Sequence, residues 1–129
     1  MTIRTITPDT VRRLAIRRQH LAAERQPATA EGILRVARDL GCLQLDPISA
    51  VARSHTLVVF SRVGAYDLKQ LDKLLWEDRA LFEYWAHVAS IVLTEDFPIY
   101  HKRMRDYCTG VDSWSESVRE WVKTNQTLH

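Results

Sequence analysis

Gln44 and Asp46 are the two side chains whose types and spacing best fit a chemical role in this sequence. A carboxylate can stabilise a developing positive charge, and it can take a proton from a water molecule as a general base. A glutamine amide both donates and accepts hydrogen bonds, so it can orient that water. On a strand, residues two apart face the same side. On a strand, the pair is therefore compatible with a hydrolytic site in which Gln44 positions a water and Asp46 activates it.

The same two residues also have a purely structural interpretation. Asp46 precedes Pro47, and this combination commonly opens a turn. Gln44 would then be an ordinary solvent-facing strand residue. For an arbitrary Gln-x-Asp this is the more frequent explanation, so the surrounding sequence has to decide between the two.

The element that carries the pair is predicted to be a short strand after a helix. Thr29 can cap a helix in which apolar residues recur at helical spacing until Gly41 ends it. Residues 42–46 are too few for a helix and stop at a proline, which favours a strand. Leu43 and Leu45 then face the core, and Cys42, Gln44 and Asp46 face the other side.

The segments that follow suggest how this strand is supported. Residues 52–63 permit a strand by propensity or a buried helix by length. Asp67 and Gln70 form a variant capping box that predicts a helix from Leu68 to Trp76, and residues 81–93 have the alternation of two strands or a hairpin. If residues 52–63 are helical, the order from residue 29 is helix, strand, helix, helix, strand, strand, which is that of a winged helix.

The two ends of the chain are predicted to be helical. Thr7 and Pro8 begin a helix that runs to about Glu24, another helix starts at Thr94 or Asp96 and ends near Cys108, and Ser113 caps a last one. The predicted fold class is α+β and mostly helical, a winged helix with an extra N-terminal helix and C-terminal helices. We expect three parts: a basic helix at 1–28, the winged helix at 29–95 and the C-terminal helices at 96–129.

Composition narrows the class of protein. With 129 residues, 46% of them apolar and 26% charged, the chain fits one soluble domain. No stretch approaches the roughly 18 apolar residues that span a bilayer, so we expect no membrane association and a cytoplasmic location. Cys42 and Cys108 match no metal spacing and are expected to be buried thiols, and the five histidines show no paired ligand spacing. We expect neither a metal nor a cofactor.

Charge is unevenly distributed along the chain. The first 25 residues hold six arginines and only two carboxylates. An anionic partner such as a phosphate backbone would favour this asymmetry, although a solvated basic helix has the same composition.

Longer motifs favour the chemical interpretation of the pair. The stretch LGCLQLDPISAVARSHTLVVFSRVGAYD, followed by LFEYWAHVAS and HKRM, resembles the YcaQ/AlkZ family of winged-helix DNA glycosylases over residues 41–104. It contains Gln-x-Asp, the segment Val51 to His55, the segment Phe60 to Arg62 and the segment Glu83 to His87 in the family's order. Family members are much longer, with three tandem winged helices, so the resemblance implies the N-terminal portion of such an enzyme. Pro47 and Ser49 depart from residues common there.

The resemblance implies a monofunctional glycosylase that excises alkylated purines and unhooks interstrand crosslinks, with Gln44 and Asp46 as the catalytic pair. A purine alkylated at N7 is cationic and leaves without a general acid, and the oxocarbenium-like transition state needs only a nearby negative charge and an oriented water. Lys69 and Lys73 lie on the predicted helix rather than beside the pair, which argues against Schiff-base lyase chemistry. The expected partner is double-stranded DNA carrying alkylated bases or crosslinks.

The DNA contacts that the resemblance suggests each have an ordinary alternative. Arg53, His55 and Arg62 are candidate phosphate or minor-groove contacts, but arginines near helix ends more often form surface ion pairs. Trp85 and His87 could wedge into an opened duplex, although we expect Trp85 to pack in the core, as aromatic strand residues usually do. A basic cluster on the following helix suits DNA or solvent equally: His101, Lys102, Arg103 and Arg105.

Two other functions fit the sequence. A non-catalytic winged helix would bind DNA through the helix from Leu68 to Trp76 and would tolerate Asp46→Asn. An inactive fragment or interaction module would instead expose apolar surface, self-associate and show no affinity for DNA.

Overall fold

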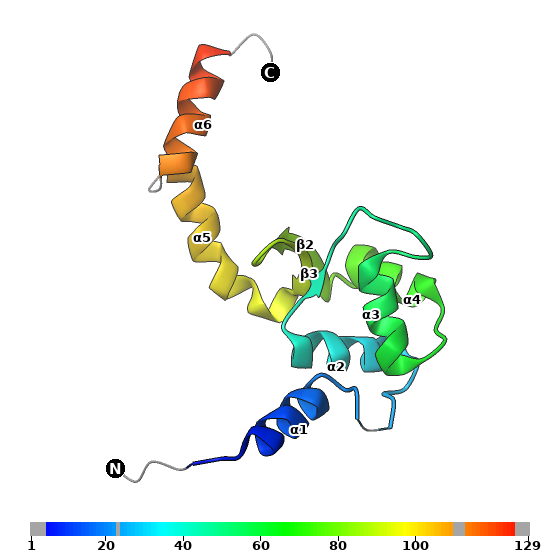
Figure 1. Ribbon diagram of the computed structural model, residues 1–129. Helices are drawn as coiled ribbons and strands as arrows, with labels where there is room; N and C mark the ends of the chain where they lie inside the picture. The colour runs from blue at the N-terminus through cyan, green and yellow to red at the C-terminus, as the bar shows by residue number, and fades with distance from the viewer. Residues whose placement is uncertain (1–4, 23, 110–112, 126–129) are drawn as a thin grey trace. The chain divides into compact units, whose positions relative to one another are not determined.

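The computed structural model describes residues 5–22, 24–109 and 113–125 and divides the chain into two compact units, Met1–Thr94 and Glu95–His129. The first unit carries the elements drawn from blue to yellow-green in Figure 1. In chain order they are α1 (Pro8–Arg18), α2 (Ala30–Leu40), β1 (Leu43–Gln44), α3 (Ser54–Val63), α4 (Leu68–Asp72), the π-helical turn η1 (Lys73–Glu77), β2 (Leu81–Trp85) and β3 (Ala89–Leu93).

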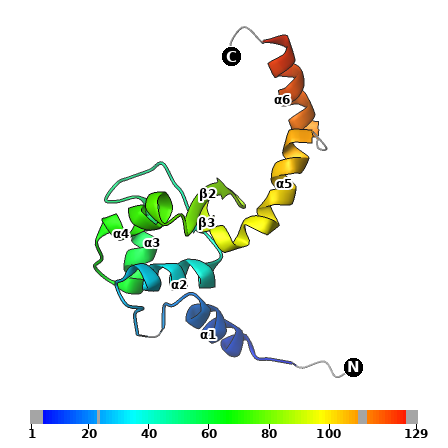
Figure 2. The same ribbon diagram turned by 180° about the vertical axis from the view of Figure 1, so that it is seen from behind.

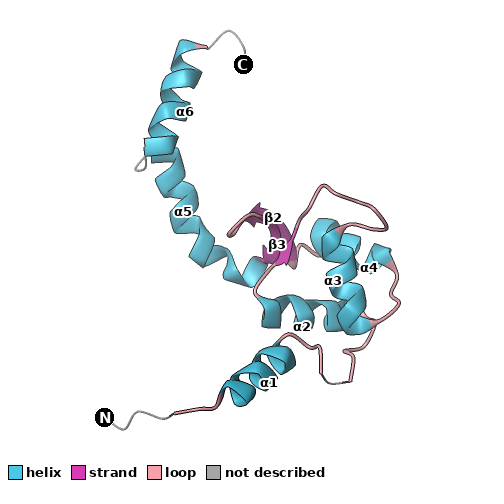
Figure 3. Ribbon diagram, in the orientation of Figure 1, coloured by secondary structure: helices cyan, strands magenta, loops and turns pink. Residues whose placement is uncertain are grey.

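From α2 to β3 this unit has the predicted winged-helix order. The sheet is antiparallel with strand order β1-β3-β2, so the last strand inserts between the other two. Figure 3 draws the labelled strands β2 and β3 in magenta and the helices in cyan. Leu43 pairs with Ile91 and Gln44 with Ser90, while β2 and β3 form the hairpin of the wing, from Leu81 opposite Leu93 to Trp85 opposite Ala89. The prediction of an α+β, mostly helical winged helix is confirmed.

Residues 52–63, which the sequence left open, are helical from Ser54. The buried residues of α3 are His55, Val59, Arg62 and Val63, spaced by four, three and one, as one face of a helix requires. The β-branched residues of this segment favour a strand locally, but burial of this face outweighs that preference. Gly64 ends the helix with a φ of 85°, a conformation that glycine adopts without strain.

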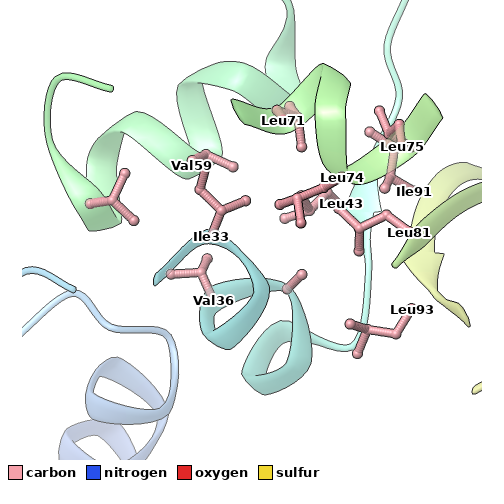
Figure 4. Packing of buried hydrophobic residues seen from close by; sticks show 12 residues of the cluster. Ile33, Val36, Leu43, Val59, Leu71, Leu74, Leu75, Leu81, Ile91 and Leu93 are labelled. Atoms are coloured by element: carbon pink, nitrogen blue, oxygen red, sulfur yellow. The ribbon is translucent and has the colours of Figure 1, made fainter. Parts of the chain in front are cut away.

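The core lies between one face of the sheet and the helices α2, α3 and α4, with η1 continuing α4. Figure 4 shows Ile33 and Val36 of α2 pointing toward Val59 of α3, with the leucines of α4 and η1 beside them. Leu43, Leu81, Ile91 and Leu93 close the cluster from the strands, each 1–2% exposed. Since a fully buried aliphatic side chain contributes about 1.5–3 kcal/mol, this cluster holds β1 firmly against its neighbours.

Three predicted elements differ from those observed. α1 ends at Arg18 rather than near Glu24, because His20 takes a left-handed φ of 55°. None of the residues of α1 is buried. β1 contains two residues instead of five, which leaves Asp46 beyond its end. The predicted helix from Leu68 loses α-helical spacing at Lys73 and finishes as η1.

The second unit is helical. A short 3-10 turn, η2 (Thr94–Asp96), leads into α5 (Phe97–Thr109), and α6 (Ser113–Thr124) follows (Figure 2). These helices match the predicted ones, while the predictions for the Cys108 and Ser113 side chains fall outside what the structure describes. Within the described ranges, no helix has the length and apolar character needed to cross a membrane.

Candidate active site

Gln44 lies exposed on the edge strand β1, opposite Ser90 of β3. Its neighbour Leu43 points the other way and is 1% exposed in the core, as strand alternation predicts. The ladder continues one residue past the strand, where Leu45 N–H donates to Ala89 O at 2.9 Å. The backbone on both sides of Gln44 is therefore fixed, and only its side chain has freedom of position.

Asp46 follows β1 in a tight turn. Its Oδ1 accepts a hydrogen bond from the backbone N–H of Ile48 at 2.8 Å, which makes residues 46–48 an Asx turn. The carboxylate is half-buried, and its Oδ2 has no hydrogen bond to any of the described residues. The turn uses one oxygen and needs no charge, because an amide oxygen would accept the same bond. The structural role of Asp46 thus leaves its second oxygen and its charge available.

The loop after the turn returns the chain to Gln44. It exposes apolar side chains, with Ile48 73% and Val51 90% exposed. At its end Ser54 Oγ donates to the backbone oxygen of Gln44 at 2.9 Å, and this bond joins the start of α3 to β1. Ser54 was not among the predicted site residues, because nothing in the local pattern indicates a contact across ten positions.

The wing supplies a further neighbour of Gln44. His87, in the turn between β2 and β3, places Nε2 3.4 Å from Gln44 Oε1 and Nδ1 3.9 Å from the thiol of Cys42. Cys42 is a free, half-buried thiol, more exposed than the buried thiol that the sequence predicts. The site thus brings an imidazole to a thiol and an amide of residues 42–44, and the Asp46 carboxylate follows in the next turn. Within the described residues there is no group of three or more His, Cys, Asp or Glu that could hold a metal ion.

A known protein family matches the part of the chain that contains these residues. The family described as DNA glycosylase AlkZ-like matches residues 37–127, a span that contains Gln44, Asp46, the wing, α5 and α6. The chain belongs to the AlkZ-like DNA glycosylase family. No solved structure matches it.

Trp85 is exposed in this AlkZ-like chain, so the expectation that it packs in the core is wrong. It ends β2 with 64% of its surface exposed, whereas Tyr84 beside it is half-buried. Consecutive residues of a strand point to opposite faces of the sheet, so Tyr84 and Trp85 cannot both face the core. Here the tryptophan faces solvent. Arg53 is exposed as well, at the N-cap of α3.

Arg62 has a structural role that the sequence did not indicate. Its guanidinium is buried and donates to Gln19 O at 3.0 Å, Gln19 Oε1 at 3.2 Å, Val58 O at 3.2 Å and Ser61 Oγ at 2.7 Å. Its backbone oxygen also accepts from Gln26 N–H at 2.9 Å. Arg62 therefore ties the segment after α1 to α3, and these bonds leave its guanidinium poorly placed to contact DNA.

His55 is also buried, with 8% of its surface exposed. Its Nδ1 has no hydrogen-bond partner among the described residues. Burial lowers the pKa of His55 below 6.5, and the positive charge of Arg53 lowers it further, while Glu83 and Asp72 act in the opposite direction. A buried neutral imidazole is poorly placed to contact a phosphate, which argues against the predicted role of His55 as a DNA contact.

The lowered pKa of His55 predicts acid sensitivity of the fold. The unfolded chain binds a proton at His55 more readily than the folded chain. The contribution of neutral His55 to the free energy of unfolding is therefore complete above pH 6.5 and is lost as pH falls through the folded pKa. Urea unfolding on both sides of pH 6.5 measures this loss. In His55→Leu we expect a smaller difference between the two conditions. Equal pH dependence in both proteins would contradict the assignment.

Two residues of the predicted basic cluster on α5 have local partners. Lys102 Nζ is 2.7 Å from Asp106 Oδ2, one turn along the helix. His101 stacks on Phe97, with ring centroids 5.5 Å apart. Both belong to the second unit.

Proposed function

We propose that this chain hydrolyses the N-glycosidic bond of alkylated purines in double-stranded DNA and thereby also unhooks interstrand crosslinks. One observation carries the proposal: Gln44 and Asp46 are two residues apart where β1 ends, within the span that matches the family, and each keeps a polar atom without a partner among the described residues. For Asp46 that atom is Oδ2, and for Gln44 it is the amide nitrogen.

The chemistry assigned to Asp46 is electrostatic stabilisation followed by proton removal. As the bond between the anomeric carbon and the alkylated base lengthens, positive charge develops on the sugar, and a nearby carboxylate stabilises it. The bonding electrons pass to the base, which neutralises its positive charge. The oxygen of a water molecule bonds to the anomeric carbon and its proton goes to Asp46. The products are the free base and an abasic site.

Gln44 is assigned the placing of that water. Its amide group can donate to the water or to a sugar-phosphate oxygen, while the fixed backbone of β1 limits where the group can reach. Arg53 at the start of α3 and Trp85 at the end of β2 are proposed to contact DNA because both are exposed. Lys102 and Arg103 remain proposed backbone contacts from α5.

Cleavage is proposed to stop at the abasic site. A Schiff-base lyase needs a lysine that loses its proton readily. Lys73 is instead ion-paired with Asp78, and this hydrogen bond raises the pKa of Lys73 above its ordinary value. Its ammonium group is therefore a poor nucleophile.

The test uses a duplex with one nitrogen-mustard crosslink between N7 atoms of opposite guanines. We expect the wild-type protein to unhook the crosslink, so that the two strands separate on a denaturing gel. The abasic site left behind should give a strand break only after hot alkali. Borohydride should trap no covalent complex. Strand breakage without alkali would overturn the monofunctional assignment, and persistence of the crosslink beside efficient removal of single N7 adducts would restrict the substrate to monoadducts.

A further inference from the structure

The imidazole of His87 bonds to two side chains of one strand edge. Cys42 and Gln44 are two residues apart, so their side chains lie on the same side of the backbone. His87 reaches both from the wing, with Nδ1 toward the thiol and Nε2 toward the amide oxygen. Each nitrogen of this ring therefore faces one of two side chains that flank Leu43 in the sequence.

Hydrogen bonding to the Gln44 amide oxygen requires one tautomer of the His87 ring. An amide oxygen can only accept, so the nitrogen that faces Gln44 Oε1 must be the N–H. In a neutral ring the other nitrogen is then an acceptor, and the S–H of Cys42 is the donor that faces it. The chain of bonds runs from the thiol through the ring to the amide, and it leaves the NH2 group of Gln44 pointing away from His87.

The wing turn does not need these contacts in order to close. Ala86 N–H donates to Val88 O at 3.1 Å, and Ser90 Oγ donates to the same oxygen at 3.0 Å. The pairing of Trp85 with Ala89 brackets the turn on both sides. The His87 side chain is therefore not needed to stabilise the turn between β2 and β3.

We propose that His87 is a positioning residue that holds the Gln44 amide, with its NH2 group directed outward to the attacking water. The contact between His87 and Gln44 is independent of the proposed hydrolysis, whereas its effect on the attacking water rests on that proposed function. It differs from the expectation that His87 touches DNA: a DNA contact acts through binding, whereas a positioning residue acts through Gln44.

Single-turnover kinetics distinguish these roles. In His87→Ala we expect excision to slow about tenfold with unchanged affinity for DNA. His87→Gln should recover most of the rate, because its terminal amide nitrogen reaches about as far as imidazole Nε2, and the shorter His87→Asn should not. In a Gln44→Ala background the His87→Ala change should cost nothing further. A weaker affinity for DNA, or an equal loss in both backgrounds, would overturn the proposal.

A measurement without substrate separates this inference from the proposed function. The ¹⁵N shifts of His87 should show the Nε2–H form, and the side-chain NH2 signals of Gln44 should move in His87→Ala and in Cys42→Ala, but less in Cys42→Ser, which keeps a donor. Unmoved Gln44 signals would refute the positioning contact even if excision occurs. Moved signals in a protein that excises nothing would leave the contact intact and refute the function.

Discussion

Asp46→Asn is expected to slow base excision by roughly three orders of magnitude, within the 10²–10⁴ that a general base typically contributes. The physical reason is the loss of negative charge beside the developing oxocarbenium ion together with the loss of the proton acceptor. The measurement is the single-turnover rate on a duplex that contains one N7-methylguanine.

Asparagine is a matched replacement because its Oδ1 can accept the Ile48 N–H bond that makes the Asx turn. The thermal unfolding midpoint and the affinity for undamaged DNA should therefore stay at their wild-type values. Asp46→Ala serves as the second variant, since it removes both the turn bond and the charge. If Asp46→Asn excises within about threefold of wild type, which is under 1 kcal/mol of barrier, Asp46 is a turn residue only.

Gly32→Ala is expected to destabilise the first unit by about 3 kcal/mol, the upper end of the cost of inserting a methyl group into a packed interior. A Cβ at Gly32 would lie 1.9 Å from the carbonyl oxygen of Pro27, so α2 or the backbone before it must move. In an unconstrained helix the same change would add about 1 kcal/mol of stability. Thermal unfolding should show a midpoint lower by about 10 °C or more.

Gly41→Ala is the matched control for this effect. Gly41 ends α2 with a φ of 80°, and a Cβ there would meet nothing within 4 Å. Its cost is then the left-handed conformation alone, about 1–2 kcal/mol. A loss in Gly32→Ala no larger than that in Gly41→Ala would contradict the close packing of Pro27 against α2.

The parts of the fold that the sequence predicted depend on local chemistry. α2 is one example, because Thr29 caps it by accepting from Gly32 N–H at 3.3 Å and Gly41 ends it in a left-handed conformation. The alternation of Leu43 and Gln44 is another, since it follows from strand geometry alone. The nature of residues 52–63 could not be settled in this way, because only packing against the core selects the helix.

The candidate site divides along the same line. Gln44 and Asp46 became candidates through their types and spacing together with the motifs around them, and a turn at Asp46 was predicted from its proline neighbour. The contact of His87 with Gln44 joins residues 43 positions apart, and so does the bond of Arg62 to Gln19. No periodicity or capping pattern encodes such pairs. The prediction that Trp85 is buried was wrong, because the local pattern does not tell which of two consecutive aromatic residues faces the core.

The most direct test of the proposed glycosylase is release of free base by the wild-type chain from a duplex that contains N7-methylguanine. With protein in excess, the account predicts that N7-methylguanine appears in solution in the same amount as alkali-labile abasic sites, and that undamaged guanine is not released. If no base is released while the duplex is bound, the chain is a DNA-binding winged helix without catalysis, and the central claim is contradicted.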